Sequence, residues 1–305
     1  MFAVELQNVT KRFGTLAAVD DLSLTVPAGS VYGFIGPNGS GKTTTLRMIM
    51  RIIYPNHGSI RVLGEDVIGK GAATDRVAYL PEERGLYRTM KVREIIRFYA
   101  ELKGYRNPRA DIARWLERMG LSDWSDKKVT ALSKGMAQKV QFICTVIARP
   151  ELVILDEPFT GLDPVNAALF IDTILDLKRG GATVILSTHD MSVAEKMCDS
   201  IFMIFKGKKV LDGPLDGIQD AYGTDTIRVR VETNGHRLDG IPGVTGVVDF
   251  GRYQELRVRD GTDPQAILEH LMKLGTVRHF EQARPSLHDI FIRIAGPEAQ
   301  EVQHA

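Results

Sequence analysis

A glycine-rich run near the N-terminus has the residue types and spacing of a phosphate-binding loop. It reads Gly36-x-x-x-x-Gly41-Lys42-Thr43. Glycines let backbone N–H groups turn toward phosphate oxygens, the lysine places a charge on the β- and γ-phosphates, and the threonine hydroxyl is a ligand for Mg²⁺. An apolar run precedes the loop and a helix is expected after it, with its positive end toward the phosphates. The expected phosphate-binding residues are Gly36, Pro37, Asn38, Gly39, Ser40, Gly41, Lys42, Thr43 and Thr44.

Two carboxylates follow a second apolar run. Residues 152–155 are expected to form a buried strand, and Asp156 and Glu157 come directly after it. Ligands bind at the carboxyl ends of parallel strands. We therefore expect Asp156 to hold Mg²⁺, directly or through water, and Glu157 to orient and polarise an attacking water as general base.

A third segment, Leu132-Ser133-Lys134-Gly135-Met136, resembles the signature sequence of ATP-binding cassette (ABC) proteins, normally Leu-Ser-Gly-Gly-Gln. Ser133 is placed as the N-cap of a helix, and this helix start with its small glycine could face a γ-phosphate. In the family that phosphate is bound to the phosphate-binding loop of a second subunit. The resemblance therefore implies that Ser133 and Gly135 act across a dimer interface, while Lys134 and Met136 depart from the pattern.

Further segments resemble motifs of the same family and occur in the family's order. Asp163 in Thr-Gly-Leu-Asp-Pro resembles the D-loop aspartate at the subunit interface. His189, after an expected strand, resembles the switch histidine near the γ-phosphate, and Phe13 resembles the aromatic residue that stacks on adenine. A structural role for this histidine and core packing for this phenylalanine remain open alternatives.

One position departs from the family in a way that bears on metal binding. Most members have glutamine where this chain has Glu82. A carboxylate is still a hard oxygen ligand for Mg²⁺, and it adds a negative charge. The resemblance implies that the catalytic residues are Lys42, Glu157 and His189, and that the metal ligands are Thr43, Asp156 and Glu82.

Two short stretches resemble a subgroup of sodium- and drug-extruding ABC exporters. They are residues 81–87, Pro-Glu-Glu-Arg-Gly-Leu-Tyr, and residues 285–291, Pro-Ser-Leu-His-Asp-Ile-Phe. In this subgroup the membrane-spanning partner is a separate polypeptide. The resemblance implies an ATP-hydrolysing subunit that uses ATP and Mg²⁺, pairs with an identical or different second ATP-binding subunit, and powers transport through separate transmembrane permease subunits.

Two other classes of function are weighed against this one. A soluble cassette ATPase acting on ribosomes or DNA usually has two cassettes or a coiled-coil insert, and this chain shows neither. A module that binds ATP without hydrolysing it would not need Glu157 and His189. The accessory C-terminal region shows no chemistry and is expected to serve packing or dimer stabilisation.

These motifs require a framework of alternating strands and helices. Residues 1–30 alternate apolar and polar side chains, which predicts an antiparallel β-element. Further along the chain we expect strands at residues 31–35, 59–63, 76–80, 152–155 and 183–186. Helices are expected at residues 44–53, 134–148 and 165–179. Amphipathic stretches between residues 90 and 132 predict a helical insert. We expect an α/β fold: a P-loop NTPase core with an antiparallel β-subdomain and a helical insert.

A second, smaller α+β domain is expected at the C-terminus. Turn signals at residues 213–223 indicate the boundary, strands are expected at 227–231, 255–258 and 276–280, and a helix at 263–274. Ser286 and Asp289 form the pattern of a capping box for a last helix. The expected domains are residues 1–220, with a helical subdomain at about 88–150, and 221–296, followed by a flexible tail at 297–305.

Composition supports a globular protein without nucleic-acid partners. The chain has 305 residues, of which 44% are hydrophobic and 25% charged, and a net charge of +1. This balance gives no strong field for nucleic acid. Two cysteines are too few for a disulfide scaffold. No run approaches the ~20 apolar residues of a membrane helix and no signal segment is evident, so we expect a cytoplasmic protein. The resemblance to ABC exporter subunits implies that it is peripheral on the cytoplasmic face of the cell membrane.

Overall fold

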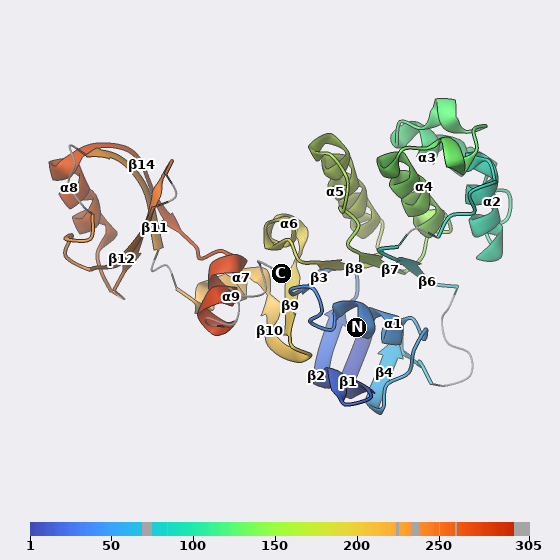
Figure 1. The fold of residues 1–305 in the computed structure, drawn as a ribbon, viewed down its shortest axis with the longest axis horizontal. Coiled ribbons are helices and arrows are strands. Elements are labelled where there is room, and N and C mark those ends of the chain that lie inside the picture. Colours follow the sequence, from blue (N-terminus) through green and yellow to red (C-terminus); the bar gives the residue numbers. More distant parts are fainter. Residues whose placement is uncertain are drawn as a thin grey trace. The chain divides into compact units, whose positions relative to one another are not determined.

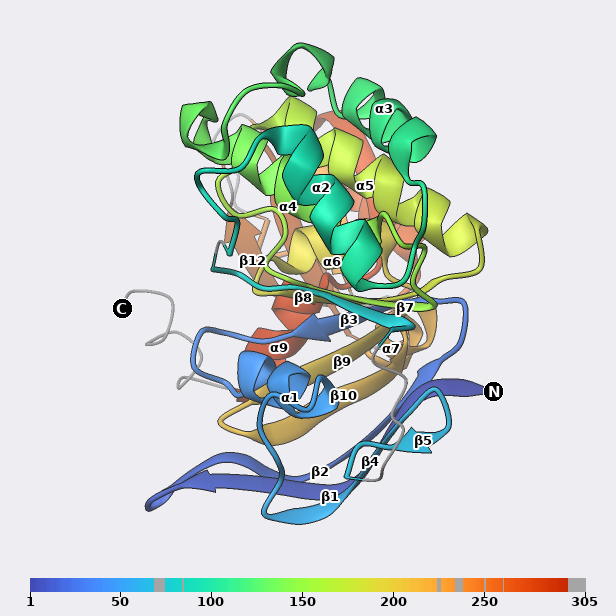
Figure 2. The same ribbon diagram turned by 90° about the vertical axis from the view of Figure 1, so that its right-hand side faces the viewer.

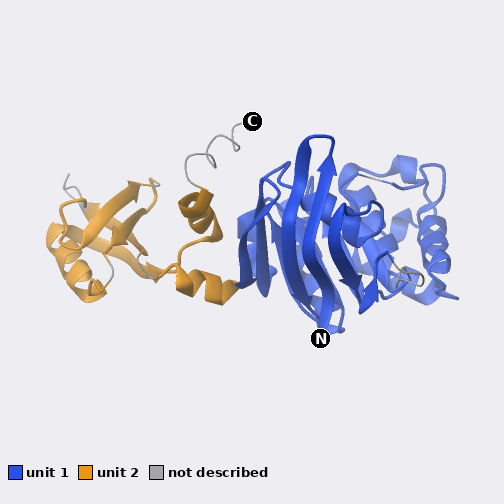
Figure 3. Cartoon of the chain, turned by 90° about the horizontal axis from the view of Figure 1, so that it is seen from below, with its two compact units in different colours: residues 1–214 blue, residues 215–305 orange. Residues whose placement is uncertain are grey.

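The computed structural model divides into two compact units, Met1–Pro214 and Leu215–Ala305 (Figure 3). It describes residues 1–68, 75–83, 85–223, 226–233, 238–249, 251–259 and 261–295. The tail expected at 297–305 lies outside these residues. No helix in the described ranges combines the length and apolar character needed to cross a membrane.

A six-stranded sheet forms the centre of the first unit. Its order is β10-β9-β3-β8-β7-β6, and neighbours are parallel except for β10 and β9. The strands are β3 (Val31–Ile35), β6 (Val77–Leu80), β7 (Leu152–Asp156), β8 (Thr183–Thr188), β9 (Ser200–Phe205) and β10 (Lys208–Pro214). Strands β3, β7 and β8 are buried throughout, as their apolar runs predict. Because they are parallel and adjacent, the residues that follow them meet at one edge of the sheet.

An antiparallel sheet and helix α1 cover one face of this central sheet (Figure 2). The strands, in the order β2-β1-β4-β5, are β1 (Phe2–Phe13), β2 (Leu16–Pro27), β4 (His57–Val62) and β5 (Glu65–Asp66). Side chains from both sheets and from α1 form one buried core, which includes Leu6, Phe34 and Leu46. Helix α1 (Lys42–Ile49) is shorter than the expected 44–53, because Arg51 adopts a left-handed conformation (φ 59°) that a continuing helix cannot contain.

Helices cover the other face, and three of them form the expected insert (Figures 1 and 2). The insert contains α2 (Val92–Leu102), α3 (Arg109–Arg118) and α4 (Lys134–Val146), with short 3₁₀ turns at Ser122–Trp124 and Val129–Ala131. Two more helices, α5 (Pro164–Arg179) and α6 (Met191–Met197), follow β7 and β8. Val92, Ile95 and Ile96 of the apolar stripe of α2 are buried, as their spacing predicts, whereas Leu102 at the end of the helix is exposed.

The second unit has its own sheet and core. The sheet is antiparallel in the order β12-β13-β11-β14, formed by β11 (Thr226–Thr233), β12 (Val244–Asp249), β13 (Gln254–Val258) and β14 (Gly275–Ala283). The helices are α7 (Leu215–Ala221), α8 (Pro264–Leu274) and α9 (Leu287–Ala295). Ser286 and Asp289 exchange hydrogen bonds at the start of α9, so the capping box is confirmed. The α/β core with an antiparallel subdomain, a helical insert and a small α+β unit is confirmed as the fold class.

Candidate nucleotide-binding site

A cavity of about 700 Å³ lies over the glycine-rich loop. The loop joins β3 to α1, so it lies at the edge of the sheet where the acidic residues after β7 also emerge. The cavity is lined by Phe13, Leu16, Ala17, Ala18, Asn38, Gly39, Gly41, Lys42, Thr43, Thr44, Glu82, Glu157, Lys206 and Gly207. Its volume is within the range of small-molecule sites.

Lys42 is held inside the glycine-rich loop. Its ammonium donates to the carbonyl oxygens of Gly36, at 2.6 Å, and Pro37, at 3.1 Å. The side chain is buried, and this burial lowers its pKa, although the nearby carboxylates of Glu157, Asp156 and Glu82 act in the opposite direction. The loop therefore fixes one cation at the floor of the cavity, where a phosphate would contact it.

Two glycines of the loop have no room for a side chain. A Cβ on Gly36 would lie 2.2 Å from the carbonyl oxygen of Ile204, and one on Gly41 would lie 2.4 Å from that of Ala18. Gly41 also has φ +109°, a conformation that favours glycine. The loop is thus packed against the neighbouring β-strands. The Ser40 hydroxyl oxygen is buried and has no hydrogen-bond partner among the described residues.

Asp156 is fully buried and is held by two hydroxyl groups. Thr43 Oγ1 donates to Asp156 Oδ2 at 3.0 Å, and the Tyr79 hydroxyl donates to the same oxygen at 3.1 Å. The other oxygen, Oδ1, has no partner within the described part of the chain. Burial raises the pKa of Tyr79, and the adjacent carboxylate raises it further, so this hydroxyl remains a donor.

Glu157 and His189 form a pair at the cavity. The carboxylate oxygen Glu157 Oε1 lies 2.9 Å from His189 Nδ1 and accepts the His189 backbone N–H at 3.0 Å. Thr188 Oγ1 donates to the second carboxylate oxygen at 3.5 Å. Glu157 has φ 48°, a conformation rare outside glycine, and its own N–H donates to the Ser187 carbonyl. Such backbone strain is typical of functional sites.

The oxygen atoms at the loop fit a magnesium ion. Asp156 Oδ1 is a buried carboxylate oxygen without a partner, and the Thr43 hydroxyl is adjacent to this carboxylate. Mg²⁺ prefers such oxygen ligands and usually takes one or two from protein and others from substrate phosphates and water.

Two family models match the chain. Residues 19–160 match the model described as "ABC transporter", and residues 213–295 match "ATP-binding protein DrrA1-3-like, C-terminal domain". The uncharacterized ABC transporter ATP-binding protein YhaQ of Bacillus subtilis (strain 168) is 39% identical over 293 residues, covering 95% of this chain and 98% of that protein. The chain belongs to the ATP-binding subunits of ABC transporters. The ATP-binding domain of this family binds and hydrolyses ATP, and its subunits work with transmembrane permeases.

Two further similarities agree with this assignment. The Nod factor export ATP-binding protein I of Burkholderia lata (strain 383) is 32% identical over 307 residues, covering 98% of both chains. A solved structure of the ATP-binding subunit of an ABC transporter aligns with a TM-score of 0.66 at 30% identity, covering 72% of this chain and 93% of that one. The fold class is therefore also that of solved ABC subunits.

Three of the expected residues of this ABC subunit, Ser133, Gly135 and Asp163, neither line the cavity nor belong to the glycine-rich loop and strand ends around it. Ser133 caps α4 by accepting the Met136 backbone N–H at 3.3 Å, and Asp163 caps α5 by accepting that of Asn166 at 2.9 Å. Both side chains are exposed. A Cβ on Gly135 would contact Leu162 Cδ2 at 3.8 Å, so the signature segment and the D-loop are adjacent. These residues form a separate, exposed group.

The remaining two expected residues lie at the cavity. The Phe13 ring is half exposed at the end of β1, with the Lys11 ammonium 5.2 Å from its centroid. An exposed ring at this position is not core packing and offers a flat face to the cavity. Glu82 is exposed and follows β6, and its charge acts on Lys42.

Some residues that build the site were not expected from the sequence. Tyr79 on β6 bonds to Asp156 on β7, and only the pairing of these strands brings them together. Gln138 on α4 donates to the carbonyl oxygen of Pro158, next to Glu157, at 3.3 Å. Lys206, after β9, lines the cavity. The sequence offered one indication for Tyr79: it lies three residues before Glu82, which was an expected site residue.

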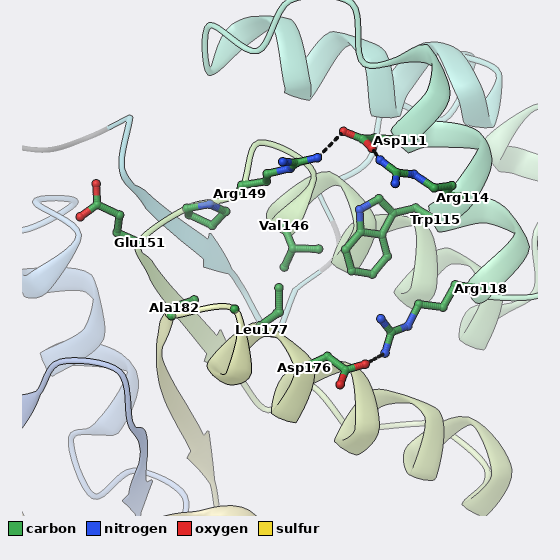
Figure 4. A pocket seen from close by; sticks show the side chains of 13 residues that line it. Asp111, Arg114, Trp115, Arg118, Val146, Arg149, Glu151, Asp176, Leu177 and Ala182 are labelled. Atoms are coloured by element: carbon green, nitrogen blue, oxygen red, sulfur yellow. Dashed lines mark hydrogen bonds and ion pairs between the residues drawn. The ribbon is translucent and has the colours of Figure 1, made fainter.

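A second cavity, of about 560 Å³, lies between the helical insert and α5 (Figure 4). Each of its charged groups has an oppositely charged partner: Arg118 pairs with Asp176, Arg114 and Arg149 with the buried carboxylate of Asp111, and Glu151 with Arg76 outside the cavity. Trp115 extends over the apolar part of the cavity. The nucleotide cavity has buried oxygen atoms without a hydrogen-bond partner close to it, such as Asp156 Oδ1, whereas no described residue that lines the second cavity has such an atom.

Proposed function

We propose that this subunit is an ATPase whose hydrolysis drives transmembrane transport. The observation that carries the proposal is the arrangement around one cavity of a buried lysine, the Thr43–Asp156 pair and the Glu157–His189 pair. These are the groups needed to bind phosphates, hold a metal and activate water.

The chain's own residues divide this chemistry between them. Lys42 and the backbone of residues 36–44 bind the phosphates, while Thr43, Asp156 and Glu82 hold Mg²⁺. The metal would supply charge neutralisation on the phosphate oxygens. Glu157 orients an attacking water and accepts its proton, and His189 fixes that carboxylate through Nδ1 and its backbone N–H. The Phe13 ring contacts the adenine base.

The exposed group formed by Ser133, Gly135 and Asp163 supports a two-subunit site. These residues lie at helix N-termini and outside the cavity of their own chain. A helix N-terminus favours a phosphate. We propose that a second ATP-binding subunit, identical or different, places this group against the phosphates, so that ATP binding closes the pair and hydrolysis reopens it.

The partners follow from the family and from the named relatives. Separate transmembrane permease subunits would bind the surface formed by residues 82–83 and 85–87 and by the insert, which would transmit closure to the membrane. The relative named for Nod factor export supports export as the direction. We accordingly propose that the subunit acts at the cytoplasmic face of the cell membrane. The ribosome or DNA alternative finds no support among these relatives.

The variant Glu157→Gln tests the proposed hydrolysis. We expect ATP binding to remain and the ATPase rate to fall by ~10²- to 10⁴-fold, because the general base is lost. ATP should then trap a dimer, visible by size-exclusion chromatography. Glu117→Gln, an exposed change on α3 outside the cavity, is the matched control. Wild-type turnover in Glu157→Gln would remove this residue from its role.

A further inference from the structure

The second unit has a small basic pocket on its sheet. The pocket has a volume of about 300 Å³ and is formed by β11, β14 and the turn that enters β13. It is lined by Arg228, Arg230, Arg252, Tyr253, Arg278 and His279. This volume is at the lower end of the range for small-molecule sites.

The alternation of β11 directs two arginines away from the core. Ile227 and Val229 are fully buried in the core of this unit, which includes side chains of α8. Residues between them on a strand point to the opposite face. Arg228 and Arg230 therefore occupy the face of the sheet opposite the core, where Arg230 is exposed.

A β-bulge adds a third arginine to the same pocket. Arg230 pairs with His279, but the next pair joins Val231 to Val277, so Arg278 is an extra residue on β14. Consecutive strand residues normally point to opposite faces, and a bulge changes this direction. As a result both Arg278 and His279 line the pocket.

Carboxylates hold two of the guanidinium groups in place. Arg228 Nε and Nη2 donate to the Glu255 carboxylate at 3.1 and 2.9 Å, and the group lies 5.0 Å from the centroid of the Tyr253 ring. Arg278 makes two parallel hydrogen bonds to Glu232, both 3.1 Å long. These contacts raise the pKa of both arginines and orient them before any ligand arrives.

The pocket has more positive than negative charge. Arg230 and Arg252 are exposed, and neither makes an ion pair within the described ranges. The carboxylates that contact the lining residues are Glu232, Glu255 and Glu281. These carboxylates contact Arg228, Arg278 and His279, so the charges of Arg230 and Arg252 are left without an ion-pair partner in the described part of the chain and repel the neighbouring guanidinium groups. An anion in the pocket would relieve that repulsion.

We propose that this pocket binds a phosphate group, carried by a small molecule or by a lipid headgroup. A phosphate monoester has a charge of about −1.5 to −2 at neutral pH and three strong acceptor oxygens, whereas a carboxylate has one charge and two oxygens. Guanidinium forks match phosphate geometry and bind it in bidentate fashion. The pocket belongs to the second unit, so the proposal does not depend on ATP hydrolysis.

Titration of the full-length chain with pyrophosphate by calorimetry tests the site. We expect two binding sites in the wild type, the glycine-rich loop and this pocket. Arg230→Gln/Arg252→Gln should lose one site or weaken it at least tenfold, because two charge-assisted contacts disappear. Arg257→Gln/Arg259→Gln removes the same charge from exposed arginines of this unit outside the pocket and should keep both sites. Lys42→Ala should lose only the loop site.

Vesicle sedimentation distinguishes the two sources of phosphate. Phosphatidylcholine vesicles with or without phosphatidic acid are the probes. A lipid source predicts that Arg230→Gln/Arg252→Gln reduces binding to phosphatidic acid vesicles, and a small-molecule source predicts that only pyrophosphate binding changes. The proposal is overturned if this double variant behaves like Arg257→Gln/Arg259→Gln with both probes. It is equally overturned if single-stranded RNA binds the pocket while neither phosphate probe does.

Discussion

A fully buried carboxylate is the central feature of the site at the scale of single residues. Asp156 has no exposure to solvent, and both hydroxyl contacts are made to one of its oxygens, Oδ2. Burying an ionised carboxylate is costly unless hydrogen bonds or a cation compensate for the lost water. Thr43 and Tyr79 supply part of this compensation, and Arg47 on α1 bonds in turn to the Tyr79 hydroxyl.

Removing the tyrosine hydroxyl tests whether it positions this carboxylate. In Tyr79→Phe we expect the Mg²⁺ concentration for half-maximal ATPase activity to rise about tenfold, because a hydrogen bond to a charged group contributes roughly 1.5–3 kcal/mol. Saturating Mg²⁺ should restore most of the rate, which a damaged fold would not allow. Tyr54→Phe, at an exposed tyrosine, should leave the metal dependence unchanged. An unaltered Mg²⁺ profile in Tyr79→Phe would exclude the positioning role.

At the scale of elements, short capped helices fix the ends of the catalytic strands. Asp190 follows His189 and caps α6, because its Oδ1 accepts the backbone N–H groups of Ser192, at 2.9 Å, and Val193, at 3.3 Å. Burial acts to raise the pKa of Asp190, but the hydrogen bonds from the Ser192 hydroxyl and from these two backbone N–H groups outweigh it, so the pKa is lowered. The cap thus holds the backbone beside the Glu157–His189 pair.

Asp190→Ala should destabilise the first unit by about 1 kcal/mol, the usual cost of losing an N-cap. Because the folded-state pKa is lowered, the part of this stabilisation that depends on the carboxylate charge is complete above the ordinary aspartate pKa and is lost as the pH falls through the lowered value. Urea unfolding at neutral and acidic pH should therefore show that the wild type is more stable than Asp190→Ala by a margin that becomes smaller in acid. Asp190→Asn, which keeps the cap without the charge, should lack this pH dependence, and equal stability of Asp190→Ala at neutral pH would contradict the assignment.

The insert is joined to the catalytic edge through α4. Gln138 contacts the carbonyl oxygen of Pro158, and Gln141, nearly one turn later, donates to that of Glu83 at 3.4 Å. Aromatic contacts continue this connection, since Phe142 lies 6.4 Å from Trp115 of α3 and 4.7 Å from Phe170 of α5, measured between ring centroids. One helix therefore contacts the segments after both β6 and β7.

At the scale of the whole molecule, the chain contains two units with separate buried cores. The core of the first combines both of its sheets with α1, and that of the second combines its sheet with α8. All residues of the nucleotide cavity belong to the first unit, and all residues of the basic pocket belong to the second. A ligand that binds in one of these pockets should therefore directly stabilise only the unit that contains the pocket.

Calorimetric unfolding with Mg-ATP checks this separation. We expect two unfolding transitions, one for each unit. ATP and Mg²⁺ should raise the free energy of unfolding of the first unit only, by ~2.7 kcal/mol when ATP is present at 100 times its Kd. Removing Mg²⁺ with EDTA should diminish the shift, and Lys42→Ala should abolish it. A single transition that shifts as a whole would show instead that the units unfold together.

The sequence alone determined those features that depend on neighbours along the chain. The spacing of Gly36, Gly41 and Lys42 predicted a phosphate-binding loop, and the apolar run before Asp156 predicted a buried strand ending in carboxylates. Alternation and helical spacing likewise predicted most elements, because both arise from local geometry. The end of α1 and the elements β5, β9, β10, β12, α6 and α7 were not predicted.

Only the tertiary structure decided the contacts between distant segments. The bond from Tyr79 to Asp156 depends on the pairing of β6 with β7, and that between Glu157 and His189 on the pairing of β7 with β8. The bulge that directs Arg278 into the basic pocket depends on the register of β14 against β11. Strand register results from packing over the whole sheet, so the local sequence pattern does not contain it.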